Sequence, residues 1–333
     1  MKKVMVLGSF VVDLMSRSPH LPEHGETVKS SFFQMGPGGK GFNQAVAAKR
    51  AGADLDVSIK LGRDEFASVA VNYMKQEGMD TRLVRETDKA ATGAALIMVD
   101  EATGQNMITV YLGASSSYTE EDLEFLTPYI EQCDYLLMQL EINLDAVAKA
   151  AAIAKAAGVR VILNPAPAAD VEPEVLKGLY AIVPNEVEAK LITGIAVNGM
   201  EDCQKAACWF RDRGVENVII TLGKNGVYVS DGQRDQLIPI NPGVEAVDAT
   251  GAGDSFCGGL LAALGEEKDI FKAAAFGNLA ANLSVTRIGT APAMPTRQEI
   301  DAFAAKLEAD GIGVAGIFAR TFIDEKDEEN GGL

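Results

Sequence analysis

The chain has 333 residues, of which 47% are apolar and 23% charged, a balance typical of a folded protein of one or two domains. Its 30 Lys and Arg against 47 Asp and Glu give a formal net charge of -17 at pH 7. A surface of that sign repels the phosphates of nucleic acids and anionic membrane surfaces. We therefore expect no nucleic-acid or membrane partner, although backbone dipoles and a few cations can still bind a nucleotide locally.

The first apolar run, residues 4–12, follows two lysines and ends at Asp13. It is short, and no small-residue cleavage site follows it, so we interpret it as a buried strand and not as a secretory leader. No later stretch reaches the roughly 18 uncharged apolar residues that a membrane span requires. These features predict a cytoplasmic protein.

Short apolar runs that suit buried strands alternate with longer Ala-rich segments of helical period. The predicted strands are residues 4–7, 135–139, 159–163, 181–183 and 218–221. The predicted helices, each followed by a glycine as helices often are, are residues 144–157, 187–193 and 202–213. This alternation predicts an α/β fold, with a doubly wound, mostly parallel sheet and helices on both faces.

Two segments break the alternation, at about residues 14–35 and 92–112, where strand-like content and turn signals occur without a joining helix. We expect a small antiparallel sheet that acts as a lid, because so small a sheet must pack on the core, a ligand or a second subunit. No linker divides the chain, so residues 1–308 are predicted to form one domain that includes the lid. Residues 309–333 carry an acidic run and are predicted to be a flexible extension.

Histidine and cysteine chemistry is disfavoured by the composition. The two histidines, His20 and His24, lie among prolines and glycine in a predicted loop, and the four cysteines have no disulfide or metal spacing. A zinc site or a Ser-His-Asp triad is therefore not expected. Catalysis is left to carboxylates, lysine or the backbone.

The strongest candidate site is the segment 247–256, which directly precedes a helical run. Its small residues Gly251, Ala252 and Gly253 let a ligand approach the backbone, and free N–H groups at a helix start point toward an anion. Asp254, near the positive end of the helix dipole, is suited to accept a proton from a hydroxyl. The same pattern is also compatible with an ordinary turn in which Asp254 caps the helix.

Three weaker polar segments lie at other predicted strand or helix ends. Residues 36–45 combine four glycines with Lys40 and Asn43 but lack the spacing of a P-loop, so they either bring polar groups to a ligand or form a turn before a helix. Asn185 and Glu188 could orient the water shell of Mg²⁺ or could cap a helix. Residues 221–226 end a strand with two glycines, which suits close passage of a nucleotide.

In this order, the segments resemble the ribokinase family of carbohydrate kinases over about residues 3–307. The residues that carry the resemblance are Gly-Gly-Lys-Gly-Phe-Asn at 38–43, Gln-Leu-Glu at 139–141, Asn-Pro-Ala-Pro-Ala at 164–168, Asn185 with Glu188, and the segment 248–254. The resemblance implies transfer of the γ-phosphoryl group of ATP to a sugar hydroxyl, with Mg²⁺ and an activating K⁺. It also implies a lid that forms a homodimer contact.

The resemblance further implies roles for individual residues on the sugar side. Asp254 resembles the base that takes the proton of the primary hydroxyl, and Gly251, Ala252 and Gly253 resemble the hole that neutralises the developing phosphate charge. The positions that match sugar contacts are Val11, Asp13, Gly39, Lys40, Asn43, Glu141 and Asp254.

Nucleotide and metal positions follow in the same way. The positions that match ATP contacts are Asn185, Thr221, Gly223, Gly226, Gly253 and Asn278. Glu188 matches the residue that organises the water shell of Mg²⁺. The positions that match a K⁺ site are Asp248, Thr250, Ser284, Arg287, Gly289 and Ala293, the last in place of a Ser often found there.

One departure from the family pattern bears on the sugar. Many ribokinases have Asn two residues before the aspartate of the first strand, where this chain has Val11 before Asp13. A buried hydroxyl without a partner costs about 1–3 kcal/mol, and deoxyribokinase-like members are apolar at this position. We expect an ATP-dependent kinase acting on the 5-hydroxyl of a pentose, ribose first. The alternatives are 2-deoxyribose, another sugar or a nucleoside, whereas a non-catalytic sugar sensor would have no need of Asp254.

Overall fold

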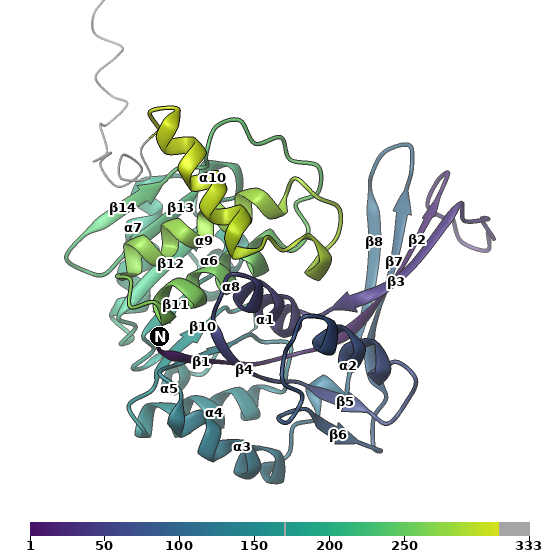
Figure 1. The fold of residues 1–333 in the computed structure, drawn as a ribbon, viewed down its shortest axis with the longest axis horizontal. Helices are drawn as coiled ribbons and strands as arrows, with labels where there is room; N and C mark the ends of the chain where they lie inside the picture. The colour runs from purple at the N-terminus through teal and green to yellow at the C-terminus, as the bar shows by residue number, and fades with distance from the viewer. Residues whose placement is uncertain (170, 313–333) are drawn as a thin grey trace, which may run out of the picture.

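The computed structural model describes residues 1–169 and 171–312, so most of the C-terminal extension expected at 309–333 lies outside the described residues. A large sheet with helices on both faces forms the body, and a smaller sheet projects from one side of it (Figure 1). The large sheet carries the site, and the projecting sheet is the predicted lid.

In the part of the chain that the structure describes, the large sheet has eight strands in the order β14-β13-β12-β11-β10-β9-β1-β4. Their bounds are β1 Lys3–Leu7, β4 Asp54–Ser58, β9 Tyr135–Met138, β10 Arg160–Leu163, β11 Ala181–Ile182, β12 Asn217–Thr221, β13 Val227–Ser230 and β14 Asp235–Ile238. Neighbours from β12 to β4 pair in parallel, whereas β13 and β14 are antiparallel. The predicted doubly wound, mostly parallel sheet is confirmed.

Helices cover both faces of this sheet because successive strand residues point to opposite sides. The helices are α1 Lys40–Arg50, α2 Ala67–Gln76, α3 Glu120–Gln132, α4 Leu144–Ala156, α5 Pro173–Leu176, α6 Glu186–Thr193, α7 Met200–Arg211, α8 Ala252–Gly265, α9 Ile270–Ser284 and α10 Arg297–Ala309. Val4 and Val6 of β1 belong to the core shared with α1, α8 and α9. Met5 and Leu7 belong to the opposite core, with α3, α4 and α7.

The smaller sheet has the order β3-β2-β7-β8, with bounds β2 Val11–Ser18, β3 Phe32–Gly38, β7 Thr92–Asp100 and β8 Asn106–Gly113. Both outer pairs are antiparallel, and the central pair β2–β7 is parallel. The first lid segment is not strand throughout, because residues 19–31 form a loop. Pro19 and Pro22 cannot donate to a ladder, which accounts for the break. At the base of the lid, β5 Lys60–Gly62 and β6 Arg85–Thr87 form a separate parallel pair.

The topology places a ligand crevice at one edge of the large sheet. Strand β1 lies inside the sheet, with β4 on one side and β9 on the other, so the winding direction changes there. In open α/β sheets, ligands bind outside the carboxyl ends of the strands at such a point. Ser9 follows β1, Gln139 follows β9, and Asn164 follows β10. The fold therefore gathers polar residues from distant segments at this edge.

Candidate active site

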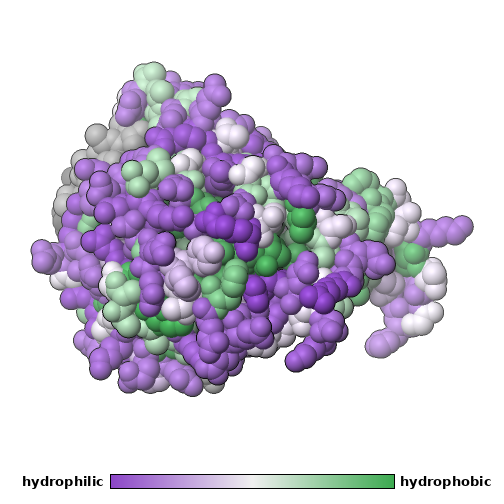
Figure 2. Space-filling model, turned by 60° about the horizontal axis from the view of Figure 1, so that its bottom comes forward, coloured by the Kyte–Doolittle hydropathy of each residue, from purple (hydrophilic) through white to green (hydrophobic). Residues whose placement is uncertain are grey.

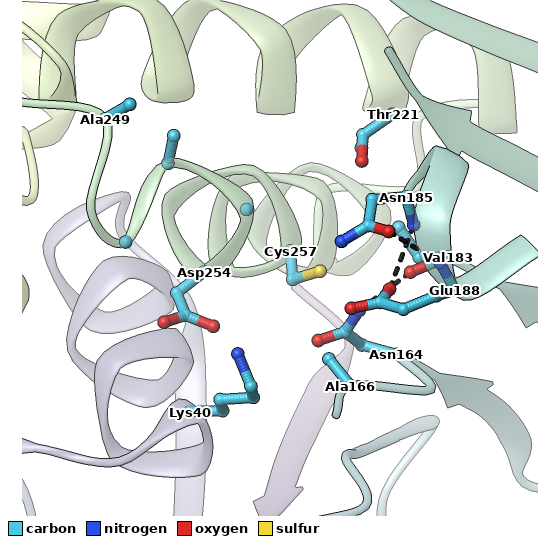
Figure 3. A pocket seen from close by; sticks show the side chains of 13 residues that line it. Lys40, Asn164, Ala166, Val183, Asn185, Glu188, Thr221, Ala249, Asp254 and Cys257 are labelled. Atoms are coloured by element: carbon cyan, nitrogen blue, oxygen red, sulfur yellow. Dashed lines mark hydrogen bonds between the residues drawn. The ribbon is translucent and has the colours of Figure 1, made fainter. Parts of the chain in front are cut away.

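A cavity of about 170 Å³ opens at the carboxyl ends of the central strands, next to the N-termini of α1, α6 and α8. Among the residues predicted for the site, those that line it are Lys40, Asn185, Glu188, Thr221, Gly251, Ala252, Gly253 and Asp254 (Figure 3). Four segments that are far apart in the sequence thus meet in one polar cavity.

Asp254 lies in the first turn of α8, as the sequence predicts, and its side chain points toward that of Lys40 (Figure 3). The carboxylate is buried and accepts two hydrogen bonds from α1. Asn43 Nδ2 donates to Oδ2 at 3.1 Å, and Gln44 Nε2 donates to Oδ1 at 2.9 Å. Close packing of the helices permits this, since a Cβ on Gly258 would lie 2.4 Å from Cβ of Ala47.

Burial and charge act on Asp254 and Lys40 in opposite senses. Burial raises the pKa of Asp254 above its ordinary value, although Lys40, Gln44 and Asn43 counteract it. Burial alone would lower the pKa of Lys40, but nearby carboxylates, Asp254 first, outweigh it and raise that pKa. Lys40 therefore stays charged over the whole physiological pH range, and the carboxylate of Asp254 is more basic than that of an ordinary aspartate.

A chain of buried amides continues from Asp254 into the sheet. Gln44 Nε2 also donates to Oδ1 of Asn164 at 2.9 Å, and Gln139 Nε2 donates to Oε1 of Gln44 at 2.6 Å. Asn164 Nδ2 in turn donates to the carbonyl of Val183 at 2.7 Å. Sequence reasoning quoted these amides as parts of motifs but assigned them no role. A signal was present, since a glutamine in the otherwise buried face of an Ala-rich helix needs polar partners.

Asn185 and Glu188 begin α6 as a capping box, in which Asn185 N–H donates to Glu188 Oε2 at 2.9 Å and Glu188 N–H donates to Asn185 Oδ1 at 2.8 Å. The capping alternative is therefore realised, yet both residues also line the cavity. Burial raises the pKa of Glu188, while the Asn185 hydrogen bond and Lys40 counteract this. A carboxylate beside a polar cavity suits a metal ion that keeps most of its water and phosphate ligands, as Mg²⁺ does.

The N-terminus of α8 presents backbone N–H groups to the cavity. Gly251 caps the helix with φ of 78°, a left-handed conformation that favours glycine. Ala252 N–H donates to the carbonyl of Ala249 at 3.2 Å, whereas the N–H groups of Gly251 and Gly253 have no acceptor in the described part of the chain. Free N–H groups at the positive end of a helix bind anions.

The predicted sugar residues lie beside this cavity, where the lid joins the body. Glu141 Oε2 accepts hydrogen bonds from Ser9 Oγ at 2.6 Å and from Lys40 N–H at 2.9 Å. Asp13 is at the base of the lid, and burial raises its pKa to about 6, with a hydrogen bond from Thr290 opposing the shift. Gly39 has φ of 91°, and a Cβ there would lie 2.9 Å from N of Val11.

Three of the predicted nucleotide residues do not line the cavity. Gly223 and Gly226 form the turn after β12, in which a Cβ on Gly226 would lie 2.1 Å from the carbonyl oxygen of Ile238. Asn278 on α9 is buried and donates from Nδ2 to the carbonyl of Pro239 at 2.8 Å. These residues shape the neighbouring loops, whereas Asn185 and Thr221, which form a parallel bridge, face the cavity.

The residues predicted for K⁺ lie in two loops that meet beside the start of α8. Asp248 Oδ1 accepts from Thr250 N–H at 2.9 Å, and its Oδ2 accepts from Gly289 N–H at 3.0 Å. These and a Thr250 side-chain hydrogen bond outweigh burial and lower the pKa of Asp248. Arg287 points its guanidinium to Glu299, and Ser284 Oγ donates to the carbonyl of Ala281. Ala293 is buried and ends the short 3-10 helix Ala291–Ala293.

Two findings concern metal and membrane chemistry. Within residues 1–169 and 171–312, no group of three or more His, Cys, Asp or Glu side chains is arranged to hold a metal ion. Over the same residues, no helix combines the length and hydrophobicity required to cross a bilayer.

Surface hydrophobic residues gather on the arm that projects at the right of Figure 2, which is the lid.

Comparison with known proteins gives similarity over nearly the whole chain. Residues 1–297 match the family described as pfkB family carbohydrate kinase. A ribokinase of Haemophilus influenzae is 42% identical over 298 residues, which cover 90% of this chain and 97% of that protein. A deoxyribokinase of Salmonella typhi is 32% identical over 301 residues, covering 90% and 98%. The structure of Arabidopsis thaliana ribokinase complexed with ribose and ATP has a TM-score of 0.82 and 28% identity, covering 90% of this chain and 98% of that chain.

Proposed function

The chain belongs to the pfkB family of carbohydrate kinases, and on that premise we propose that it transfers the γ-phosphoryl group of ATP to the 5-hydroxyl of ribose. The family resemblance read from the sequence is thereby confirmed. The observation that carries the proposal is the buried carboxylate of Asp254, held by Asn43 and Gln44 at the N-terminus of α8 and facing Lys40. A sensor that only binds sugar would need no such group.

Asp254 is the proposed base. Its carboxylate takes the proton of the 5-hydroxyl while the sugar oxygen bonds to the γ-phosphorus and the bond from that phosphorus to the leaving ADP oxygen breaks. The free N–H groups of Gly251 and Gly253 are placed to stabilise the charge that develops on the transferred group. Lys40, which the nearby carboxylates keep charged, adds a positive charge that attracts the incoming phosphate.

Mg²⁺ and the nucleotide fit the opposite wall of the cavity, formed by Asn185, Glu188 and Thr221. We propose that Glu188 holds the ion through its water shell and that Asn185 and Thr221 contact the nucleotide, with Gly223, Gly226 and Asn278 shaping its pocket. When bound, Mg²⁺ supplies charge neutralisation to the phosphate oxygens. Glu188 is prearranged for this by its hydrogen bond from Asn185 N–H.

A K⁺ site is the next part of the proposal. Asp248 supplies a carboxylate of lowered pKa, and its hydrogen bonds to Thr250 and Gly289 hold the two loops together. Carbonyls of Thr250, Ser284, Arg287, Gly289 and Ala293 would complete a set of oxygen ligands. An ion there would act on the N-terminus of α8 without touching the sugar, since both loops adjoin Gly251.

The preference between ribose and 2-deoxyribose depends on Val11. It lies two residues before Asp13 in β2, so both side chains are on one face of the lid. Val11 is only 4% exposed, and its Cγ1 fills the space left by Gly93, where a Cβ would lie 2.8 Å away. Similarity to a ribokinase at 42% identity supports ribose, whereas the apolar Val11 and the similar deoxyribokinase support 2-deoxyribose as the alternative.

Val11→Asn should raise the ratio of kcat/KM for ribose to that for 2-deoxyribose by about 5- to 150-fold, because an amide can pair with the additional hydroxyl. Coupled measurement of ADP release with both sugars, ATP and Mg²⁺ gives this ratio, and wild type should use ribose at least as well as 2-deoxyribose. A wild-type preference for 2-deoxyribose would replace ribose by the alternative. No turnover of either sugar would overturn the proposed pentose substrate.

The lid is proposed to form a homodimer contact. Phe33, Met35, Leu96, Met107 and Tyr111 are 50–65% exposed, and the strand register puts all five on the face opposite Asp13. An apolar sheet face of this kind suits burial against a second copy. We also propose that the protein acts in the cytoplasm, where ATP is available.

Leu96→Glu should weaken the dimer by about 100-fold or more, because an unpaired charge would be buried in the contact. Sedimentation equilibrium over a range of protein concentrations measures this. Leu144→Glu, an exposed apolar residue at the start of α4 on the body, is the matched control and should sediment as wild type does. A dimer of unchanged affinity in Leu96→Glu would exclude this face of the lid as the contact.

A further inference from the structure

Gln44 is the central residue of the buried amide chain. Its side chain is fully buried, its Nε2 lies 2.9 Å from both Asp254 Oδ1 and Asn164 Oδ1, and its Oε1 accepts from Gln139 Nε2 at 2.6 Å. The opposite orientation of the amide would place Nε2 against another N–H donor and Oε1 against a carboxylate oxygen. One orientation alone therefore satisfies the neighbours, and it directs an N–H group at Asp254.

The partners of Gln44 are themselves anchored in the sheet. Gln139 directly follows β9, and Asn164 directly follows β10 and donates to the carbonyl of Val183. Gln44 thus connects the ends of two strands to a carboxylate on α8. Because each partner directly follows a strand of the sheet, the position of Asp254 Oδ1 is set relative to the sheet that carries the rest of the site.

Each oxygen of Asp254 receives one N–H donor, from Asn43 and Gln44 respectively. Loss of the Gln44 donor would leave Oδ1 without its restraint and would destabilise the ionised form. The charged and titratable groups that bear on Asp254 from the surrounding elements are Lys40, Glu141, Asp13, Glu188 and Cys257. None of these replaces the short contact to Oδ1, so the effect of Gln44 is separable from theirs.

We infer that Gln44 is a positioning residue for the catalytic carboxylate, which it orients toward the sugar hydroxyl and keeps ionised through its N–H donor. The inference rests on the proposed function for its catalytic part. Its structural part, a specific bond between Gln44 and ionised Asp254, does not need turnover and is tested separately.

Gln44→Met keeps the length of the side chain and removes the donor. We expect the acidic limb of the pH profile of kcat/KM for ribose to move upward by about one to two pH units, because a hydrogen bond to a charged group contributes that much to the pKa. We also expect kcat to fall by at least about tenfold, with a smaller change in the dissociation constant of ribose. An unshifted limb together with unchanged kcat would overturn the inference.

Gln139→Met is the matched control, since it removes an amide from the same chain while Gln44 Nε2 still faces both of its acceptors. A purely structural role predicts that both variants lose stability and that neither moves the acidic limb. The positioning role predicts that only Gln44→Met moves it. Equal shifts in both variants would contradict a specific bond between Gln44 and Asp254.

Urea unfolding at several pH values tests the same bond without turnover. Burial raises the native pKa of Asp254, so its contribution to stability is present at low pH and is lost as the pH rises through that native value. Gln44→Met raises the pKa further, so its stability deficit relative to wild type should grow as the pH rises from the native pKa of wild type to that of the variant. The growth should vanish in an Asp254→Asn background. A deficit independent of pH in both backgrounds would refute the bond, even if the enzyme phosphorylated no sugar.

Discussion

Asp254→Asn should lower kcat by about 10²- to 10⁴-fold while ribose still binds, because the variant loses the proposed base and little else. The fold should tolerate the change. Asn43 Oδ1 is buried without a partner, so the Asn43 amide can turn to accept from the new amide at position 254. Steady-state kinetics gives kcat, and calorimetric titration with ribose gives the dissociation constant of ribose.

The control for this variant is Asp269→Asn, another aspartate at a helix start, where it accepts from Lys272 N–H as the N-cap of α9. Asn caps helices about as well as Asp, so kcat should equal that of wild type. If Asp254→Asn retained a kcat within about tenfold of wild type, the base would have to be another group.

Lys40→Met should reduce kcat by about 10²- to 10³-fold, the range found when one preorganised group that stabilises transition-state charge is removed. Lys40 lowers the pKa of Asp254 against the dominant effect of burial. Its removal should therefore raise that pKa, and the acidic limb of the pH profile should move to higher pH. The carboxylates of Glu141 and Glu188 would also lose the positive charge of Lys40, which lies near them.

Lys49→Met is a suitable comparison, because Lys49 belongs to the same helix but lies in its last turn, away from the cavity. Its kcat and pH profile should match those of wild type. If Lys40→Met lowered kcat but left the acidic limb in place, Lys40 would stabilise transition-state charge only. It would then have no effect on the pKa of Asp254.

The fold was predictable because its signals are local. Short apolar runs such as those at β1 and β12 alternate with Ala-rich helices, and only a covered parallel sheet buries both. The lid was predicted less completely. Its parallel β2–β7 pair joins segments some 80 residues apart, and no periodicity within either strand specifies which neighbour it takes.

The site shows the same division. Asp254 and the N–H groups before α8 could be identified from a short segment, because a glycine-rich turn before a helix has a local physical meaning. The Asn185–Glu188 pair also has local meaning. The structure shows the capping alternative, and both residues also line the cavity. The orientation of the Gln44 amide has no such local signal, because its partners are 95, 120 and 210 positions away along the chain.

By itself, the sequence determined the class of fold, the family, and the carboxylate proposed as the base, because hydrophobic period and helix-start chemistry act between residues close in the chain. Only the tertiary structure decided what surrounds that carboxylate. The contacts of Gln44 with Gln139 and Asn164, and of Thr290 with Asp13, arise when strand ends and helix starts converge at one edge of the sheet. Such contacts depend on the packing of whole elements, and packing is a property of the folded chain and not of any segment within it.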